Sequence, residues 1–272
     1  MFRPNMHGKT DQLAEEIKRV IKRVSGMDIS GYKNDFLLRR VRARMLALGI
    51  TNYKEYLRRL KYDPEEIDRL LNELSINVSE FFRDPWIWEK ISNILWDLIY
   101  RKTIVRIWSA GCSRGEEPYT IAMLVKEVIS GVNGFKKVTI YATDIDADAI
   151  RRAQEGVYDV SSLKNVPKYL LYKYFDRVSV GRYKIRDSVK ELVKFRCHDL
   201  IKDPPLIFMD IVFCRNVLIY FNKDLQQRVL MKLYKSLNRD GFLVLGISEY
   251  LPENVRNMFK VYDQRARIFQ KI

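Results

Sequence analysis

The chain has few of the side chains that most often carry metal or redox chemistry. Its 272 residues include only two histidines, His7 and His198, and three cysteines, Cys112, Cys197 and Cys214. The cysteines are odd in number and never form a C-x-x-C pair, so neither a disulfide framework nor a zinc site is expected. We expect each cysteine to be a small buried hydrophobe, and no metal to be bound.

Long apolar runs are also missing. No stretch approaches the roughly 20 apolar residues that a membrane-spanning helix needs, and residues 1–10 contain no apolar run that could act as a secretory signal. We therefore expect a cytoplasmic protein without direct membrane insertion.

Acidic residues are outnumbered, since 49 Lys and Arg face 34 Asp and Glu, which gives a formal net charge of +15. This charge favours an anionic partner, whether nucleic acid, an acidic membrane surface or an acidic protein, and charge alone does not choose among them. The hydrophobic share of 47% is ordinary for a globular chain of one large or two modest cores.

The first quarter of the chain has a helical pattern. From Gln12 to about Leu74, apolar residues recur at spacings of three and four, and no strand-like alternation appears. Pro64 is well placed for a first helical turn. We predict helices near residues 12–24, 34–48, 52–60 and 64–75.

After Thr103, short β-branched runs alternate with helical ones, which predicts an α/β domain whose parallel sheet is covered on both faces. Residues 161–188 interrupt this rhythm with a predicted helix and a hairpin around Gly181, so we treat them as an insertion. The predicted strands are Ile104–Ser109, Val138–Thr143, Leu192–Arg196, Ile211–Cys214 and Phe242–Gly246, and the predicted helices are Glu116–Ile129, Ala147–Gln154, Pro167–Tyr174 and Asp224–Leu237.

The most informative local sequence joins the first predicted strand to the helix after it. It carries Gly111 and Gly115 in a tight turn. Such a turn lets the backbone approach a ligand at the carboxyl end of the first strand, where doubly wound sheets bind nucleotides. The turn does not match G-x-G-x-x-G, so alone it is a weak signal.

Two acids, Glu116 and Glu117, follow this turn. At a helix N-terminus they would repel phosphate. They therefore favour a ligand that lacks phosphate and carries positive charge, as S-adenosylmethionine does. The alternative is that acids in a first helical turn only complement the helix dipole.

Acids also follow the next two predicted strands. Asp144 can accept hydrogen bonds from both hydroxyls of a ribose, as an acid does in the dinucleotide fold. Helix N-capping is the alternative, and it suits Asp146 better. Asp199 could accept from an adenine amino group, although aspartate is also common in turns.

Several motifs, taken in order, resemble those of the chemotaxis receptor methyltransferase (CheR) family. They are Asn77-Val-Ser-Glu-Phe-Phe-Arg-Asp84, Gly115-Glu-Glu-Pro-Tyr119, Ala142-Thr-Asp-Ile-Asp146 and, above all, Phe213-Cys-Arg-Asn-Val-Leu-Ile-Tyr-Phe221. The resemblance runs from about Asp28 to the C-terminus. It implies a Rossmann-like class I methyltransferase sheet with an all-α N-terminal domain and a small antiparallel β insertion.

The resemblance also implies an activity: an enzyme that uses S-adenosylmethionine to esterify glutamates of chemotaxis receptors and releases S-adenosylhomocysteine. Residues 1–76 would form a receptor-facing helical domain, and residues 77–102 a linker that contributes to the cofactor site. Residues 103–272 would form the methyltransferase domain, with the β insertion at about 161–188 also facing the receptor. The cofactor would lie between the domains.

By the same resemblance, Arg83 and Tyr220 would lie nearest the methyl group. Many relatives have Thr in place of Ser79 and often Asn in place of Asp199, and both changes keep an acceptor. Gly111 is also predicted to contact the cofactor, because it lies in the tight turn after the first predicted strand. The predicted cofactor-binding residues are Asn77, Ser79, Arg83, Gly111, Glu117, Asp144, Asp199, Leu200, Asn216 and Val217.

This chemistry explains a site that is poor in histidine. A glutamate carboxylate, with a reference pKa of about 4.3, is ionised at neutral pH and needs no general base. His198 is therefore expected to be structural. Arginine can hold a carboxylate by both oxygens, which makes Arg83 and Arg215 catalytic candidates. Tyr220 could donate a hydrogen bond or lie beside the sulfonium. Without the motif, the sequence predicts only a half-buried aromatic at this position.

The helix predicted at 34–48 carries arginines opposite its apolar face, without a compensating acid. Such a face is usually just solvated. Here it favours the acidic helical methylation region of a receptor, and we expect the helix to deliver the receptor glutamate to the domain cleft of a monomeric enzyme. The apolar face has Leu37, Leu38, Val41, Met45 and Leu48; the predicted substrate-binding residues are Arg39, Arg40, Arg42 and, at the border, Arg44.

Two other functions are compatible with parts of the sequence. A nucleic-acid methyltransferase is favoured by the basic charge and by Asp203-Pro-Pro-Leu206, which is similar to the D/N-P-P-aromatic signature of amino-group methylation. Its fourth residue is not aromatic, however, and it precedes the fourth strand instead of following it, so no nucleic-acid partner is expected. A non-catalytic module that senses the cofactor is disfavoured because the motif residues are intact.

Overall fold

The computed structural model describes residues 6–74 and 79–272, with side chains from Thr10 onward. The chain forms two compact units. The helical unit comprises residues up to 76 together with Tyr220–Gln226, and the sheet unit comprises residues 77–219 and Gln227–Ile272. None of the described helices is long and apolar enough to cross a membrane.

The helical unit contains the four helices predicted from apolar spacing. Their shared core includes Ile17, Leu37 and Leu60, each fully buried. Asn52 caps its helix by accepting a hydrogen bond from Lys54 N, which fits the preference for Asn at that position. The helices are α1 Met6–Ser25, α2 Asn34–Ala47, α3 Tyr53–Tyr62 and α4 Pro64–Leu74.

A distant segment completes the helical unit. Lys33 N donates to Tyr220 O at 3.0 Å, and Asn222 N donates to Gly31 O at 2.8 Å. Tyr32 and Phe221 form an isolated antiparallel bridge. Residues 220–226 therefore pack with α2 and the turn before it.

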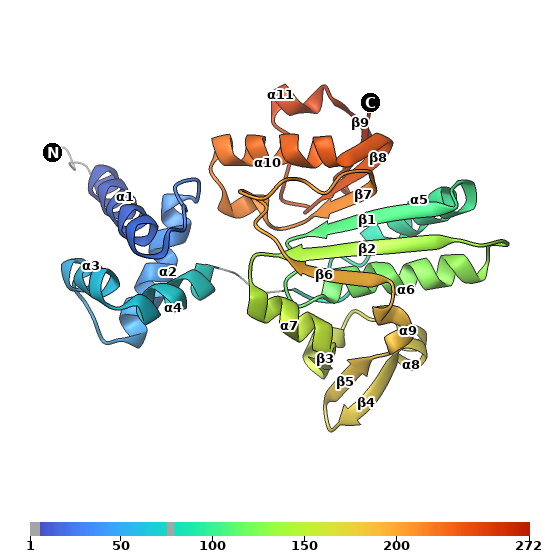
Figure 1. The fold of residues 1–272 in the computed structure, drawn as a ribbon, viewed down its shortest axis with the longest axis horizontal. Coiled ribbons are helices and arrows are strands. Elements are labelled where there is room, and N and C mark those ends of the chain that lie inside the picture. The colour runs from blue at the N-terminus through green and yellow to red at the C-terminus, as the bar shows by residue number, and fades with distance from the viewer. Residues whose placement is uncertain (1–5, 75–78) are drawn as a thin grey trace. The chain divides into compact units, whose positions relative to one another are not determined.

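Seven strands form the main sheet in the order β6-β2-β1-β7-β8-β10-β9 (Figure 1). The first five run parallel, as predicted, but β10 is antiparallel to both β8 and β9. All five predicted strands lie in the parallel part of the sheet. Strands β9 and β10 were not predicted, and their short connection allows only an antiparallel pair. The strands are β1 Ile104–Ala110, β2 Lys137–Asp144, β6 Val193–Cys197, β7 Met209–Cys214, β8 Leu237–Leu245, β9 Phe259–Asp263 and β10 Ile268–Lys271.

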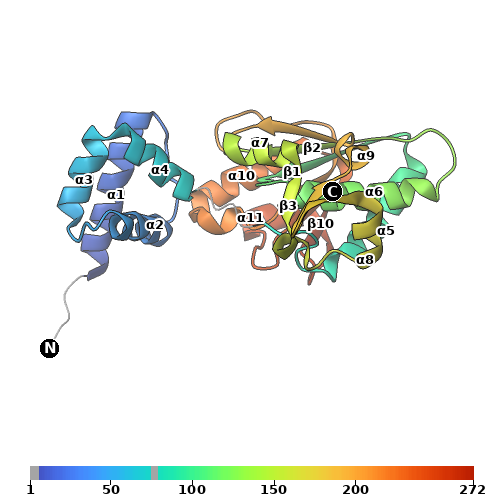
Figure 2. The same ribbon diagram turned by 90° about the horizontal axis from the view of Figure 1, so that it is seen from below.

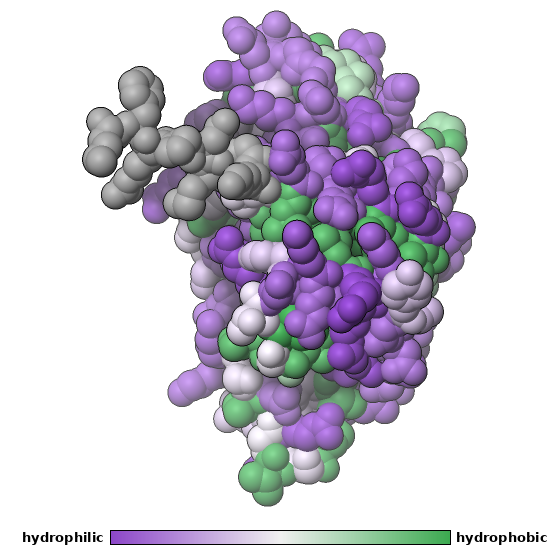
Figure 3. All heavy atoms as spheres, turned by 90° about the vertical axis from the view of Figure 1, so that its left-hand side faces the viewer, coloured by the Kyte–Doolittle hydropathy of each residue, from purple (hydrophilic) through white to green (hydrophobic). Residues whose placement is uncertain are grey.

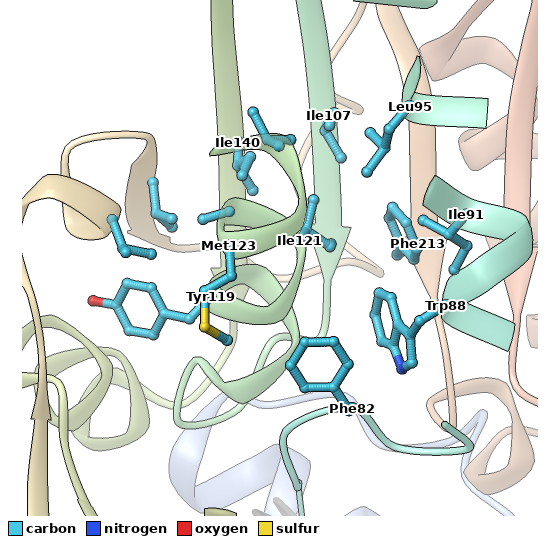
Figure 4. Close-up of a cluster of buried hydrophobic side chains, with 14 of the residues drawn as sticks. Phe82, Trp88, Ile91, Leu95, Ile107, Tyr119, Ile121, Met123, Ile140 and Phe213 are labelled. Carbon is cyan, nitrogen blue, oxygen red and sulfur yellow. The ribbon is translucent and has the colours of Figure 1, made fainter. Parts of the chain in front are cut away.

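Helices cover both faces of the sheet (Figures 1 and 2). On one face, α5 and α6 pack side chains such as Ile91 and Ile121 against Ile107, Ile140 and Phe213 of the strands (Figure 4). Trp88 of α5 stacks on Phe213, with ring centroids 6.1 Å apart. The helices are α5 Ile87–Arg101, α6 Glu116–Ser130, α7 Ala147–Glu155 and, over the other face, α10 Lys223–Ser236; the remaining short ones are α11 Glu253–Arg256 and the 3₁₀ turn η2 Leu218–Tyr220.

The insertion forms a separate antiparallel sheet in the order β3-β5-β4, which confirms the predicted antiparallel insertion and adds the strand β3 to the predicted hairpin. Gly181, at φ +72°, makes the tight turn between β4 and β5, a conformation that favours glycine. Its elements are β3 Val157–Asp159, the 3₁₀ turn η1 Val160–Leu163, α8 Lys168–Tyr174, β4 Phe175–Ser179, β5 Arg182–Ile185 and α9 Asp187–Lys190.

Candidate cofactor and methyl-transfer site

The carboxyl ends of four parallel strands gather the predicted polar residues at one edge of the sheet. Ala110 pairs with Thr143 at the ends of β1 and β2, and Asp144 pairs with Cys197 at the ends of β2 and β6. The chain builds β2 and β6 on one side of β1 and then returns to place β7 on the other. Open α/β sheets bind ligands at this reversal of strand order.

The turn after β1 needs its glycines. Gly111 has φ +77° and Gly115 has φ +93°. A Cβ on Gly111 would lie 2.5 Å from Cγ2 of Val217, so the turns after β1 and β7 approach too closely for a side chain there. Gly111 therefore brings backbone to the strand ends, as the sequence predicts.

Asp144 fixes the same turn. Its Oδ2 accepts from Ser113 N at 2.7 Å, and its Oδ1 accepts from Asp146 N at 3.0 Å. Burial raises the pKa of Asp144 above its ordinary value, and these hydrogen bonds oppose the rise. Each oxygen keeps a further lone pair, which leaves capacity for two ribose hydroxyls. The N-cap of α7 is Asp146, which accepts from Asp148 N and Ala149 N.

Glu116 and Glu117 point into the protein instead of facing solvent at the start of α6. Burial raises the pKa of Glu116 to about 7, and a hydrogen bond from Ser79 opposes the rise. Burial also raises the pKa of Glu117, against the nearby Arg215. Ser109 Oγ donates to Glu117 Oε1 at 2.8 Å. Acids that only complemented the dipole of α6 would not need this burial.

Arg215 is enclosed by protein carboxylates. Its side chain is 2% exposed and donates to Asp84 Oδ2 at 2.6 Å and to Glu117 Oε2 at 3.4 Å. Its guanidinium also lies 5.5 Å from the ring centre of Trp88. Both terminal nitrogens of the Arg215 guanidinium, which is predicted from the sequence to hold a ligand carboxylate, therefore already donate to protein carboxylates. One donor, Nε, is buried without a partner among the described residues and remains for a ligand.

The backbone around Arg83 is tightly held. Phe82 and Asp84, on either side, adopt left-handed φ values of 51° and 55°. Trp88 Nε1 donates to Arg83 O at 3.0 Å, and Arg215 Nη2 donates to the same oxygen at 3.3 Å. Such strained residues persist where surrounding contacts hold them, commonly at functional sites. Asp84 ends the first motif, but nothing in the sequence predicts its ion pair with Arg215.

The turn after β7 is organised by a residue that the sequence analysis missed. Glu249 Oε2 accepts from Asn216 N at 3.0 Å and from Gly246 N at 2.7 Å, while Oε1 accepts from Leu218 N at 2.8 Å and from Ile219 N at 3.3 Å. Nothing local in the sequence marks this glutamate. Asn216 has φ +60°, and its Oδ1 is buried without a partner in the described chain. That orphaned acceptor fits a ligand with a donor, such as the ammonium of S-adenosylmethionine.

The predicted site residues divide between the two units. Gly111, Glu117, Asp144, Asp199, Leu200, Asn216 and Val217 lie in the sheet unit, with Ser79, Arg83 and Arg215, whereas Tyr220 and the four arginines lie in the helical unit. Asn77 lies outside the described residues. Tyr220 packs on Phe36 with ring centroids 4.7 Å apart.

The arginines of α2 are not equivalent. Arg39 and Arg40 each lie 5.7 Å from the ring centre of Phe36. Arg44 instead donates to both carboxylate oxygens of Glu66, at 2.9 and 2.7 Å, and Glu66 is fully buried. The expectation that these arginines lack a compensating acid is therefore wrong for Arg44. Hydrophilic side chains dominate the face drawn in Figure 3.

His198 is buried in the sheet unit, and its Nδ1 has no partner among the described residues, so a structural role for it stays a prediction. It is 3% exposed, its Nε2 lies 3.1 Å from Pro204 O, and its ring meets Trp108 edge to face. Cys112 and Cys214 are buried, but Cys197 is exposed, so the prediction of three buried cysteines is wrong at the end of β6, an edge strand of the sheet. The described residues contain no cluster of His, Cys, Asp or Glu suited to a metal ion.

Two family models match most of this chain. Residues 77–268 match the CheR methyltransferase SAM-binding domain, and residues 13–75 match the CheR all-alpha domain. The sheet unit is thus an S-adenosylmethionine-binding methyltransferase domain. The chain belongs to the CheR methyltransferase family.

Relatives of nearly equal length include the chemotaxis protein methyltransferase of Borreliella burgdorferi, 32% identical over 93% of both chains. The chemotaxis protein methyltransferase of Escherichia coli is 32% identical over 88% of this chain and 85% of its own. A 104.1 kDa protein of Rhodobacter capsulatus is 32% identical over 95% of this chain, which spans only 28% of that protein.

Proposed function

We propose that this methyltransferase forms methyl esters on glutamate side chains of chemotaxis receptors. The names of the two relatives of similar length support a role in chemotaxis. The basic charge of +15 supports an acidic protein as the acceptor.

One observation carries the proposal: several carboxylates, largely shielded from solvent, gather at the ends of the parallel strands. Glu117, Asp144 and Asp84 surround Arg215 and the turn after β1. Such a site favours a cationic, phosphate-free nucleoside over a nucleotide. A carboxylate acceptor is already ionised at neutral pH, so the proposed reaction needs no general base.

In this proposal the sulfonium of S-adenosylmethionine supplies the methyl group, and the protein supplies orientation. Asp144 would accept from the ribose hydroxyls, and Asn216 Oδ1 from the ammonium. The Nε donor of Arg215 and the side chain of Arg83 would hold carboxylates. Orienting two reactants in line contributes on the order of 7–11 kcal/mol to lowering the barrier.

Acceptor recognition is proposed to use the exposed arginines of α2, Arg39 and Arg42, with Arg40. Tyr220 packs against this helix through Phe36, so within the helical unit Arg39, Arg40 and Tyr220 share one aromatic contact. In this proposal residues 1–76 face the receptor, residues 77–102 contribute to the cofactor site, and residues 103–272 form the methyltransferase domain.

The test offers tritiated S-adenosylmethionine with a receptor cytoplasmic fragment and RNA side by side. Base-labile counts on the fragment, lost when its acidic methylation sites are changed to alanine, would support glutamyl esters. Base-stable counts on RNA would favour a nucleic-acid methyltransferase instead. Cofactor binding by calorimetry with no transfer to any receptor would favour a sensing module.

A further inference from the structure

The loop after β6 satisfies nearly all of its own backbone donors. Asp199 Oδ1 accepts from Ile201 N at 2.8 Å and from Lys202 N at 3.2 Å. Asp203 Oδ2 accepts from Asp199 N at 2.9 Å, and Asp203 N donates to Asp199 O at 2.8 Å. Asp199 and Asp203 therefore close residues 199–203 into a compact loop.

A lysine from α10 satisfies the carbonyls of the same loop. Lys232 Nζ donates to Leu200 O at 2.8 Å, Ile201 O at 2.8 Å and Asp203 O at 2.6 Å. An ammonium has three donors and no acceptor, so these three carbonyls use all of its hydrogen-bonding capacity. Desolvation lowers the pKa of Lys232, while Asp199 and Asp203 oppose the shift.

One backbone donor remains in this loop. Leu200 N has no hydrogen-bond partner within the described chain, whereas the other four N–H groups of residues 199–203 are bonded inside the loop. Backbone donors in structured loops normally find a partner, and a ligand can provide it. A purine ring offers nitrogen acceptors of the required kind.

We infer that Lys232 is a positioning residue for the adenine of the cofactor. By fixing three carbonyls, it sets the loop so that Leu200 N–H is left to donate to N1 of adenine, the ring nitrogen next to the amino group assigned to Asp199. Asp203 does the same from the other side by fixing Asp199 N. Neither side chain needs to touch the cofactor. This inference rests on the proposed assignment of Asp199 and Leu200 to cofactor binding.

The alternative is a loop brace that stabilises the fold without affecting base recognition. Calorimetry with two ligands separates these possibilities: S-adenosylhomocysteine and its deaminated analogue, S-inosylhomocysteine. In the analogue a ring nitrogen carries hydrogen and no longer accepts. Lys232→Met removes the three donors while keeping an unbranched chain, and Lys235→Met, on an exposed lysine of the same helix, is the matched control.

The wild type and Lys235→Met are expected to prefer S-adenosylhomocysteine by about tenfold or more, since a lost hydrogen bond leaves Leu200 N–H unpaired. Lys232→Met should weaken S-adenosylhomocysteine binding by about tenfold and shrink the preference to about twofold. Amides of Ile201 and Lys202 should exchange faster in this variant. Asp203→Ala should change affinity and preference in the same direction, which provides a second variant if Lys232→Met is poorly folded.

An unchanged preference between the two ligands in both variants would overturn the inference, even if their melting temperatures fell. The wild type provides the separate check on the proposed function. If it bound S-adenosylhomocysteine with no preference over the analogue, the placement of adenine at Leu200 would be wrong. If it bound cofactor but methylated no receptor, only the proposed acceptor would fail.

Discussion

The carboxylates at the strand ends and the arginines of α2 use charge in opposite ways. Asp144 and Glu117 are held by backbone and side-chain donors, and burial raises the pKa of each. Arg39 and Arg42 are exposed, and Arg42 donates to Tyr53 Oη at 2.8 Å. Buried charges thus fix geometry, whereas exposed charges contribute mainly to attraction and association rate. Arg44 also lies on α2, but it behaves like the buried charges because it pairs with the buried Glu66.

The sharpest test of this contrast lies within α2 itself. Arg44→Met would leave the fully buried Glu66 without its cation, and loss of one partner of a buried ion pair costs about 3–5 kcal/mol. We expect that loss in the free energy of unfolding of the helical unit, measured by urea denaturation. Arg42→Met, on the exposed side of the same helix, should cost less than about 1 kcal/mol. Equal losses would mean that burial does not separate these arginines.

The next largest effect is expected at the strand ends. Asp144→Ala should raise the Kd for S-adenosylhomocysteine by roughly 100-fold or more, because two hydrogen bonds to a charged acceptor contribute about 1.5–3 kcal/mol each. Calorimetry provides the measurement. Asp148→Ala, an exposed acid in the first turn of α7, is the control and should bind as the wild type does. If Asp144→Ala bound S-adenosylhomocysteine with the wild-type Kd, the proposed contact between Asp144 and the ribose would be wrong.

The buried carboxyl of Glu116 makes the stability of the protein depend on pH. Its pKa is about 7 in the folded protein and near 4.5 when unfolded, so between these values the folded state binds more protons. Stability from this group is present at low pH and is lost as pH rises through about 7. The loss is roughly 3 kcal/mol at most, since each pKa unit corresponds to about 1.4 kcal/mol.

Glu116→Gln should therefore gain stability relative to the wild type as pH rises from 4.5 to 7.5, measured by denaturation at several pH values. Glu253→Gln, on an exposed residue, should follow the wild-type profile. Parallel profiles for Glu116→Gln and the wild type would show that Glu116 does not hold a proton in the folded protein.

The smallest effect is expected from the exposed arginines. Reversing Arg39 and Arg42 to Glu should raise the KM for receptor about tenfold at low salt, through loss of electrostatic attraction. The effect should shrink at high salt, where exposed charges are screened. Cofactor affinity should stay at its wild-type value. Unchanged kinetics at low salt would reject α2 as the acceptor-binding helix.

Local sequence predicted most elements because the spacing of apolar residues is itself a local property. The four helices of the helical unit and all five predicted sheet strands are present, with ends shifted by a few residues. Helix α5 is absent from the sequence-based prediction, which gives residues 77–102 as a linker. Its apolar residues nevertheless have helical spacing, at Ile87, Ile91, Leu95 and Leu98. Strands β9 and β10 were missed because an edge hairpin is defined by its partner strand, β8.

The site shows the same limit. Asp144 and Glu117 could be predicted because each follows directly on a recognisable strand or turn. The roles of Asp84, Glu249 and Lys232 could not, since their partners lie up to 131 residues away in the chain, as with Asp84 and Arg215.

The order of helices and strands, the excess of positive charge and the acids that end β2 and begin α6 can all be read from the amino-acid sequence. Which charges are enclosed depends on the folded chain. The fold pairs Arg44 with Glu66 and Arg215 with Asp84, and it closes the loop of residues 199–203 with Lys232. The physical reason is that periodicity acts over a few residues, whereas burial and hydrogen bonding depend on chain segments that meet only when the protein folds.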